Sequence, residues 1–169
     1  IGLVNGLWAN DMGVGGLIPI EVFSIPTNSK LELELTGQQG DVMRESMRCA
    51  KTVAWNLIPN KCKERLNKEW KDFGNTGIHI HCPDGSTPKD GPSAGAAITT
   101  AIISMLLREP VDNKIAMTGE INLKGEVTEI GGLSQKLNGA KKAGVTHVLI
   151  PYQNLSLIHI SEPTRQNQI

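Results

Sequence analysis

The chain has 169 residues, enough for one domain with a hydrophobic core, and its 17 basic and 17 acidic residues give a net charge of zero. This balance excludes the broad basic surface that binds nucleic acid or an anionic membrane, so we expect neither as a partner. The three cysteines, Cys49, Cys62 and Cys82, follow no pattern, which argues against a disulfide framework and favours a reducing compartment. No apolar stretch reaches the roughly 18 residues that span a bilayer.

The first half of the chain predicts strands followed by two helices. LIPIEVFSI and KLELELT are predicted to be strands around a Pro-Thr-Asn turn, because Leu and Glu alternate in the second segment. From Asp41, apolar residues recur every three or four positions until Pro59, which predicts an amphipathic helix. A shorter polar helix is expected to end near Phe73, with Gly74 as its stop.

The second half predicts two further helices among strands. IHIHC alternates as a strand, and CPDGSTPKDGP is a loop dense in turn residues. Residues 93–107 are small and apolar almost all round, so this helix should be buried in the middle of the domain. KIAMTGEINLKGEVTEI predicts a hairpin turning near Gly125, followed by a helix ended by Gly144 and a last strand, VTHVLIP. The hairpins exclude a simple doubly wound parallel sheet and indicate an α+β (mixed α/β) fold.

The heptapeptide KDGPSAG places Ser93 where loop becomes buried helix. Unpaired backbone N–H groups at such a helix start could stabilise an oxyanion. We expect the neighbouring Gly91 and Gly95 to let a substrate backbone come close. Ser93 is therefore a candidate nucleophile.

Lys136 is the candidate base. Successive residues of a helix are rotated by about 100° around its axis. In the helix that starts at Leu133, this rotation places Leu133, Leu137 and Ala140 on one buried stripe and Lys136 at the edge of that stripe. The positive end of the helix dipole and the flanking leucines both disfavour an ammonium there, and a general base has to be neutral. The ordinary alternative is a snorkelling lysine whose amine reaches water.

Three blocks of sequence resemble the proteolytic domain of the Lon family of ATP-dependent serine proteases. They are PDGSTPKDGPSAG, MTGEINLKGEVTEIGGLSQKLNGAKKAG and GLWAND with GGLIPIE, and the similarity extends over about residues 1–155. The resemblance implies mixed sheets with hairpins packed on a buried central helix. The interval of 43 residues between Ser93 and Lys136 is the family's spacing.

The resemblance also implies a Ser–Lys dyad that hydrolyses peptide bonds of unfolded or damaged proteins through an acyl-enzyme. Lys136 takes the proton of Ser93, and Gly91 and Ala94 support the nucleophile. Thr118 matches the residue that hydrogen-bonds and orients the lysine. Asp90 matches an acidic position beside the nucleophile, where a carboxylate would raise the pKa of the amine. His79 and His81 match positions near the nucleophile loop, where we expect them to be structural.

Members of this family usually carry an ATPase module and form hexameric rings. The chain starts IGLVNG, without Met or a signal-peptide pattern, so we expect it to be part of a longer protein. ATP and Mg²⁺ would then act in that module, with no cofactor in this chain, in the cytoplasm or alternatively the mitochondrial matrix. Residues 156–169 resemble translated sequencing adapter, so we expect a non-native tail in place of the family's last elements.

Four alternatives remain open from the sequence. His79 or His81 could replace Lys136 as the base, or could bind a metal with Asp84 and His147. Ser93 could hold a phosphate at a helix N-terminus, as in small-molecule kinases, although the GxxxxGK[ST] pattern is absent. The domain could also be catalytically dead and kept for assembly.

Overall fold

A six-stranded mixed sheet with the strand order β3-β4-β2-β1-β5-β8 organises the fold. The structure is a computed structural model, and it describes residues 1–83 and 91–155. The central strands β4, β2 and β1 pair antiparallel, whereas β3, β5 and β8 each join the sheet in parallel. The strands are β1 (Leu3–Ala9), β2 (Gly15–Pro26), β3 (Leu33–Thr36), β4 (Thr76–His81), β5 (Ile115–Met117) and β8 (His147–Leu149).

The predicted strands on either side of the Pro-Thr-Asn turn exist but do not pair with each other. Strand β4 lies between β2 and β3 and bonds to both. Its Ile78 and Ile80 are fully buried, whereas β3 exposes Glu34 at the edge of the sheet. An apolar strand gains most from the central position, and a charged strand is tolerated at an edge.

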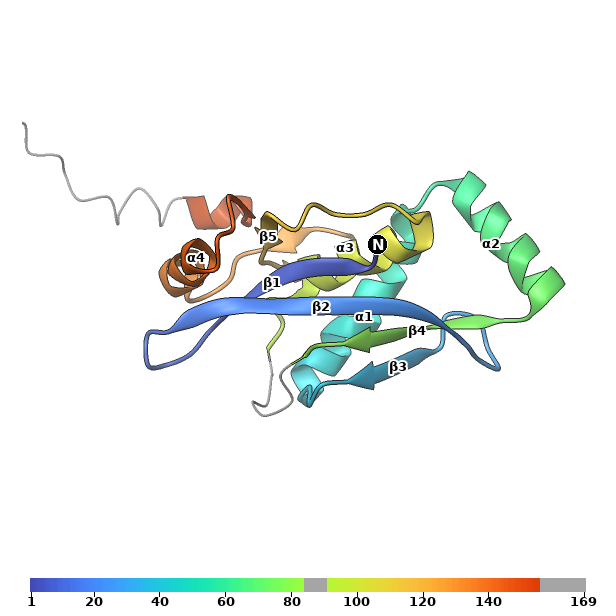
Figure 1. Ribbon diagram of the computed structural model, residues 1–169, viewed down its shortest axis with the longest axis horizontal. Coiled ribbons are helices and arrows are strands. Elements are labelled where there is room, and N and C mark those ends of the chain that lie inside the picture. The colour runs from blue at the N-terminus through green and yellow to red at the C-terminus, as the bar shows by residue number, and fades with distance from the viewer. Residues whose placement is uncertain (84–90, 156–169) are drawn as a thin grey trace, which may run out of the picture.

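Two helices cover one face of this sheet, as Figure 1 shows. They are α1 (Asp41–Leu57) and α3 (Gly95–Leu107), which pack on each other. The prediction of a buried central helix is confirmed, because α3 buries residues all round its surface, including Ala97, Ile98, Ala101 and Ile102. It starts at Gly95, after Ser93 and its cap Ala94.

The polar helix α2 (Asn60–Phe73) lies at one end of the molecule and α4 (Leu133–Lys142) at the other (Figure 1). The prediction that glycines stop these helices is confirmed, since Gly74 has φ = 96° and Gly144 has φ = 78°, conformations that favour glycine. No helix in the described ranges is both long and apolar enough to cross a membrane.

The hairpin expected around Gly125 is present but short. It consists of β6 (Glu120–Ile121) and β7 (Val127–Thr128), with Gly125 at φ = 83° in its turn. The preceding apolar segment forms β5 in the main sheet, because Ala116 and Met117 are buried there. A single 3₁₀ turn, η1 (Tyr152–Asn154), follows β8 and contacts β7.

Candidate active site

Ser93 and Lys136 lie 43 residues apart in the chain and meet through their side chains. The Nζ atom of Lys136 donates a hydrogen bond of 3.0 Å to Oγ of Ser93. Lys136 is only 4% exposed, and this burial lowers the pKa of its amine from the ordinary value of 10.5. The pair thus combines a hydroxyl with an amine that is biased toward its neutral form.

The backbone before α3 holds Ser93 in place. The carbonyl oxygen of Ser93 accepts hydrogen bonds from the N–H of Gly119, at 2.8 Å, and from the hydroxyl of Thr118, at 3.3 Å. The N–H of Gly95 in turn donates to the carbonyl of Pro92, at 3.1 Å. The loop between β5 and β6 therefore fixes the position from which Oγ projects.

Lys136 is held by the close packing of α4 on β2. Lys136 N–H donates to the carbonyl of Gly132, whose φ of 68° permits the turn into the helix. The buried face consists of Leu133, Lys136, Gly139 and Ala140, while Leu137 is half-buried. The buried face is therefore rotated around the helix relative to the predicted stripe. The prediction that Lys136 lies at its edge was wrong, because the lysine lies inside the buried face.

A cavity of about 720 Å³ opens beside the pair and is lined by Ser93, Lys136, Gly91 and Ala94. This volume is within the range of sites for small molecules or peptide side chains. Apolar side chains from the two N-terminal strands and α1 form much of the remaining wall, namely Leu7, Trp8, Leu17, Ile18, Pro19 and Met43. Asp11 is the one carboxylate that the described residues contribute to the lining.

Sequence reasoning did not identify these wall residues individually. Trp8 and Asp11 lie in the GLWAND block that carried part of the resemblance, so that block contained the signal. Met43 gave no signal, because a methionine at helical spacing is indistinguishable from an ordinary core residue. Only the packing of α1 shows that it borders the cavity.

Thr118 makes a different hydrogen bond from the one expected. Its hydroxyl donates to the carbonyl of Ser93, and it has no hydrogen bond to Lys136 among the described residues. The reason is topological: residues 118 and 119 run alongside the backbone of Ser93, and the Gly119 N–H reaches the same carbonyl. Thr118, 2% exposed, thus positions the serine in this structure.

The two glycines beside the serine have different roles. Gly91 lines the cavity with φ = 132°, a conformation that favours glycine, and a Cβ atom there would meet nothing within 4 Å. Gly95 is buried, and a Cβ atom on it would lie 3.0 Å from the backbone nitrogen of Ile121. The expectation that Gly95 admits a substrate was therefore wrong, because its missing side chain serves internal packing.

The two histidines bond to Thr36 of β3. The Thr36 hydroxyl lies 2.8 Å from Nε2 of His79 and 2.7 Å from Nδ1 of His81. Neither ring has a hydrogen bond to Ser93 within the described residues, so the alternative of a histidine base gains no support. Within residues 1–83 and 91–155, no group of three or more His, Cys, Asp or Glu side chains could hold a metal. Asp84 and Asp90 lie outside the described residues.

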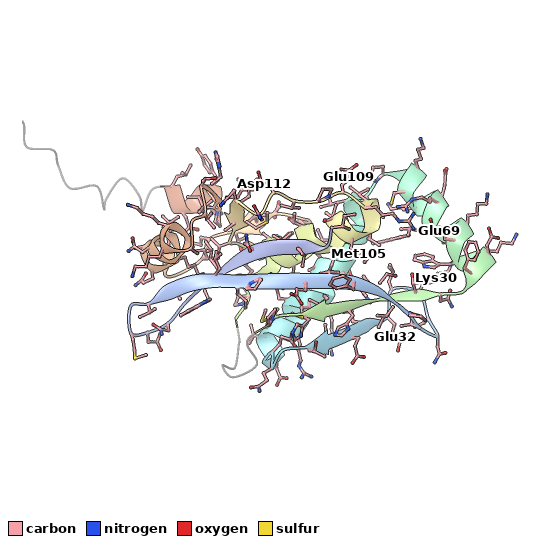
Figure 2. The ribbon with its side chains drawn as sticks, in the orientation of Figure 1. Lys30, Glu32, Glu69, Met105, Glu109 and Asp112 are labelled. Atoms are coloured by element: carbon pink, nitrogen blue, oxygen red, sulfur yellow. The ribbon has the colours of Figure 1, made fainter. Side chains whose placement is uncertain are left out.

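A second cavity, of about 420 Å³, lies between α2 and the end of α3 and contains none of the predicted site residues. Glu69 and Met105 line it, and Figure 2 shows both at the α2 end of the molecule, away from α4. Glu69 is paired there with Arg108. This second cavity is therefore separate from the cavity beside Ser93 and Lys136.

Comparison with known proteins agrees with the geometry. Residues 1–167 match the family described as the Lon protease (S16) C-terminal proteolytic domain. The Lon protease of Haemophilus influenzae is 46% identical over 168 residues, which cover 99% of this chain and 20% of that protein. A Lon protease homolog of Acanthamoeba polyphaga mimivirus is 45% identical over 159 residues, 91% of this chain and 15% of that protein.

The Lon protease of Vibrio parahaemolyticus is 46% identical over 154 residues, 91% of this chain and 19% of that protein. The chain therefore spans a fifth or less of the length of these relatives. The similarity is high, extends over nearly the whole chain and falls on the proteolytic part of the family. The chain belongs to the Lon protease family and corresponds to its C-terminal proteolytic domain.

Proposed function

We propose that Ser93 and Lys136 form the catalytic dyad of an endopeptidase. Neutral Lys136 takes the hydroxyl proton of Ser93 as Oγ attacks the carbonyl carbon of a peptide bond, and the carbonyl electrons move onto its oxygen. When the tetrahedral intermediate collapses, the C–N bond breaks and the Lys136 ammonium gives its proton to the leaving amine. The acyl group remains as an ester on Ser93.

The second half of the reaction repeats these steps with water. Lys136, neutral again, removes a proton from a water molecule that attacks the ester. The C–Oγ bond then breaks, and the proton returns to Oγ of Ser93 as the carboxylic acid product leaves. The same amine acts as base and acid in both halves, which matches its position at 3.0 Å from Oγ.

The negative charge of the tetrahedral intermediate needs hydrogen-bond donors near Ser93. The N–H groups of Gly95 and Ala96 already donate to the carbonyls of Pro92 and Gly119. The N–H groups of Ser93 or Ala94, which precede α3, therefore take this role. The two occupied N–H groups also weaken the phosphate alternative, because a phosphate would need the same donors.

The observation that carries the proposal is the hydrogen bond between Nζ of Lys136 and Oγ of Ser93. A serine-directed acylating reagent tests it, with attachment located by mass spectrometry. We expect labelling at Ser93 that is lost in Ser93→Ala and in Lys136→Ala. Lys141→Ala, an exposed lysine of the same helix, is the control and should be labelled normally. Full labelling of Lys136→Ala would contradict the dyad.

For the full-length protein we propose unfolded protein substrates and a homo-hexamer. A peptide bond has to reach Ser93 inside a cavity, which an extended chain does more readily than a folded protein. Cleavage of an unfolded casein-like chain, with a folded protein of similar length left intact, is the expected result. Equal cleavage of both would contradict this substrate class.

ATP and Mg²⁺, which the family implies, do not fit the described residues. Those residues offer no group of three or more metal-ligating side chains, and the first turn of α3 has donors already bonded internally. We propose that nucleotide acts in a module of the full-length protein outside this chain. The three free cysteines support a reducing location, for which we propose the cytoplasm, with the mitochondrial matrix as the alternative.

A further inference from the structure

Helix α4, like α1, α2 and α3, starts without a side-chain cap. Its N-cap residue is Gly132, and no side chain caps the helix there. An uncapped helix end is weakly held by its own sequence, so its position depends on contacts with the rest of the fold. Lys136 lies in the first turns of this helix, and its amine must stay within hydrogen-bond distance of Ser93.

A buried asparagine holds the backbone immediately before this helix. Oδ1 of Asn154 accepts a 3.0 Å hydrogen bond from the N–H of Ile130, and Nδ2 of Asn154 donates a 2.9 Å hydrogen bond to the carbonyl of Ile130. Asn154 is 0% exposed, and Ile130 is also buried. A buried amide that satisfies both backbone groups of one residue fixes its position and orientation together. Only Gly131 and Gly132 separate Ile130 from α4.

The turn that carries Asn154 also touches the segment that holds Ser93. Pro151 is fully buried, and its Cγ atom would lie 3.5 Å from a Cβ atom placed on Gly119. Gly119 is the residue whose N–H binds the Ser93 carbonyl. One short turn therefore bears on both halves of the dyad, because Pro151 at its start borders Gly119 and Asn154 at its end binds Ile130.

We infer that Asn154 is a positioning residue for the Ser–Lys dyad: through Ile130 it fixes the start of α4 and so the distance between Nζ of Lys136 and Oγ of Ser93. The inference rests on the proposed function, because it assigns Asn154 a role through Lys136. Its side chain touches neither substrate nor the reacting atoms in this structure. It acts by keeping α4 pressed onto β2 and Lys136 out of water.

Loss of the two hydrogen bonds between Asn154 and Ile130 should change the pKa of Lys136, an effect that a general loss of fold stability does not have. If the start of α4 moves, water reaches Lys136, and the pKa of its amine rises toward its ordinary value because desolvation keeps it low. Among the described residues, Asp11 is the one charged side chain besides Lys136 that lines the cavity, and Lys141 and Lys142 of α4 are exposed. Partial unfolding would instead lower the amount of active protein and leave the pH midpoint of the remainder unchanged.

The test measures the rate of Ser93 acylation against pH in the intact chain, for Asn154→Leu and Asn154→Asp. Leucine removes both bonds, whereas aspartate keeps the acceptor for Ile130 N–H. We expect Asn154→Leu to lower the labelling rate at neutral pH by at least about tenfold, since small displacements of catalytic groups cost this much. Its pH midpoint should move upward, with Asn154→Asp between it and the wild type. Tyr152→Ala, 85% exposed in the same turn, should change neither quantity.

Two results would overturn the inference. One is a wild-type rate and midpoint in Asn154→Leu, or in Asn154→Asp if the leucine variant does not fold. The other is an unchanged pH midpoint together with a labelling rate that falls in proportion to the unfolded fraction measured by circular dichroism. Failure of the proposed function is a separate outcome, since labelling of Lys136→Ala would show it whatever Asn154 does.

Discussion

Gly139 of α4 faces Gly15 of β2 with no room for a side chain between them. A Cβ atom on Gly139 would lie 2.4 Å from the carbonyl carbon of Gly15, and one on Gly15 would lie 2.1 Å from the carbonyl oxygen of Gln135. Helix and strand therefore touch backbone to backbone. This contact brings the face of α4 that carries Lys136 down onto the sheet.

Gly139→Ala should lift α4 from β2. Alanine favours a helix over glycine, but here its methyl group meets backbone atoms that cannot move aside, so we expect a loss of about 1–3 kcal/mol in the free energy of unfolding. The Ser93 labelling rate should fall by at least about tenfold, because Lys136 moves with the helix. Chemical denaturation and labelling kinetics measure the two effects. Asn138→Ala, at an exposed neighbouring position, is the control, and equal behaviour of the two variants would refute the argument.

The labelling rate of Ser93 should rise with pH. Only the neutral amine of Lys136 accepts the serine proton, and burial lowers its pKa, so the rise should be complete below the ordinary lysine pKa of 10.5. A pH series of labelling rates checks this, with Lys141→Ala giving the same curve as the wild type. A rate that is independent of pH up to 10.5 would mean that Lys136 is not the base.

Local patterns predicted the helices well. The recurrence of apolar residues after Asp41, the apolar run after Ser93 and the glycines at helix ends each depend on neighbours a few residues away, which the sequence displays directly. The resemblance in the blocks around Ser93 and Lys136 supplied their pairing. Helix and strand propensities alone could not predict this pairing, because the hydrogen bond joins residues 43 positions apart in the chain.

The features that the sequence did not reveal all concern contacts between distant segments. The insertion of β4 between β2 and β3 depends on which strand is buried, and the bond of Thr118 to Ser93 depends on how two loops lie side by side. The burial of Lys136 follows from the contact of Gly139 with Gly15. Each of these features depends on how distant segments pack in three dimensions. The periodicity of a single helix or strand carries no information about that packing.

Thr118→Val should weaken the support of Ser93 without removing it. The variant loses the hydroxyl bond to the Ser93 carbonyl but keeps the bond from the Gly119 N–H. We expect a loss of about 0.5–1.5 kcal/mol in the free energy of unfolding, the usual contribution of one such bond, and a reduced labelling rate. Thr118→Ser, which retains the hydroxyl, should recover most of the rate. A serine variant as impaired as the valine variant would show that the methyl group matters instead.

Lys136→Met should stabilise the fold most at low pH. Below the lowered pKa of Lys136 both folded and unfolded chains carry the ammonium, so the wild type bears the full cost of burying it, and methionine of similar length does not. Between the folded pKa and 10.5 the unfolded chain binds a proton that the folded chain has released, so the free energy of unfolding of the wild type rises with pH. The advantage of the methionine variant should therefore shrink as pH increases. Urea denaturation at several pH values measures it, and a difference that stays constant up to pH 10.5 would show that the amine is not desolvated in the folded protein.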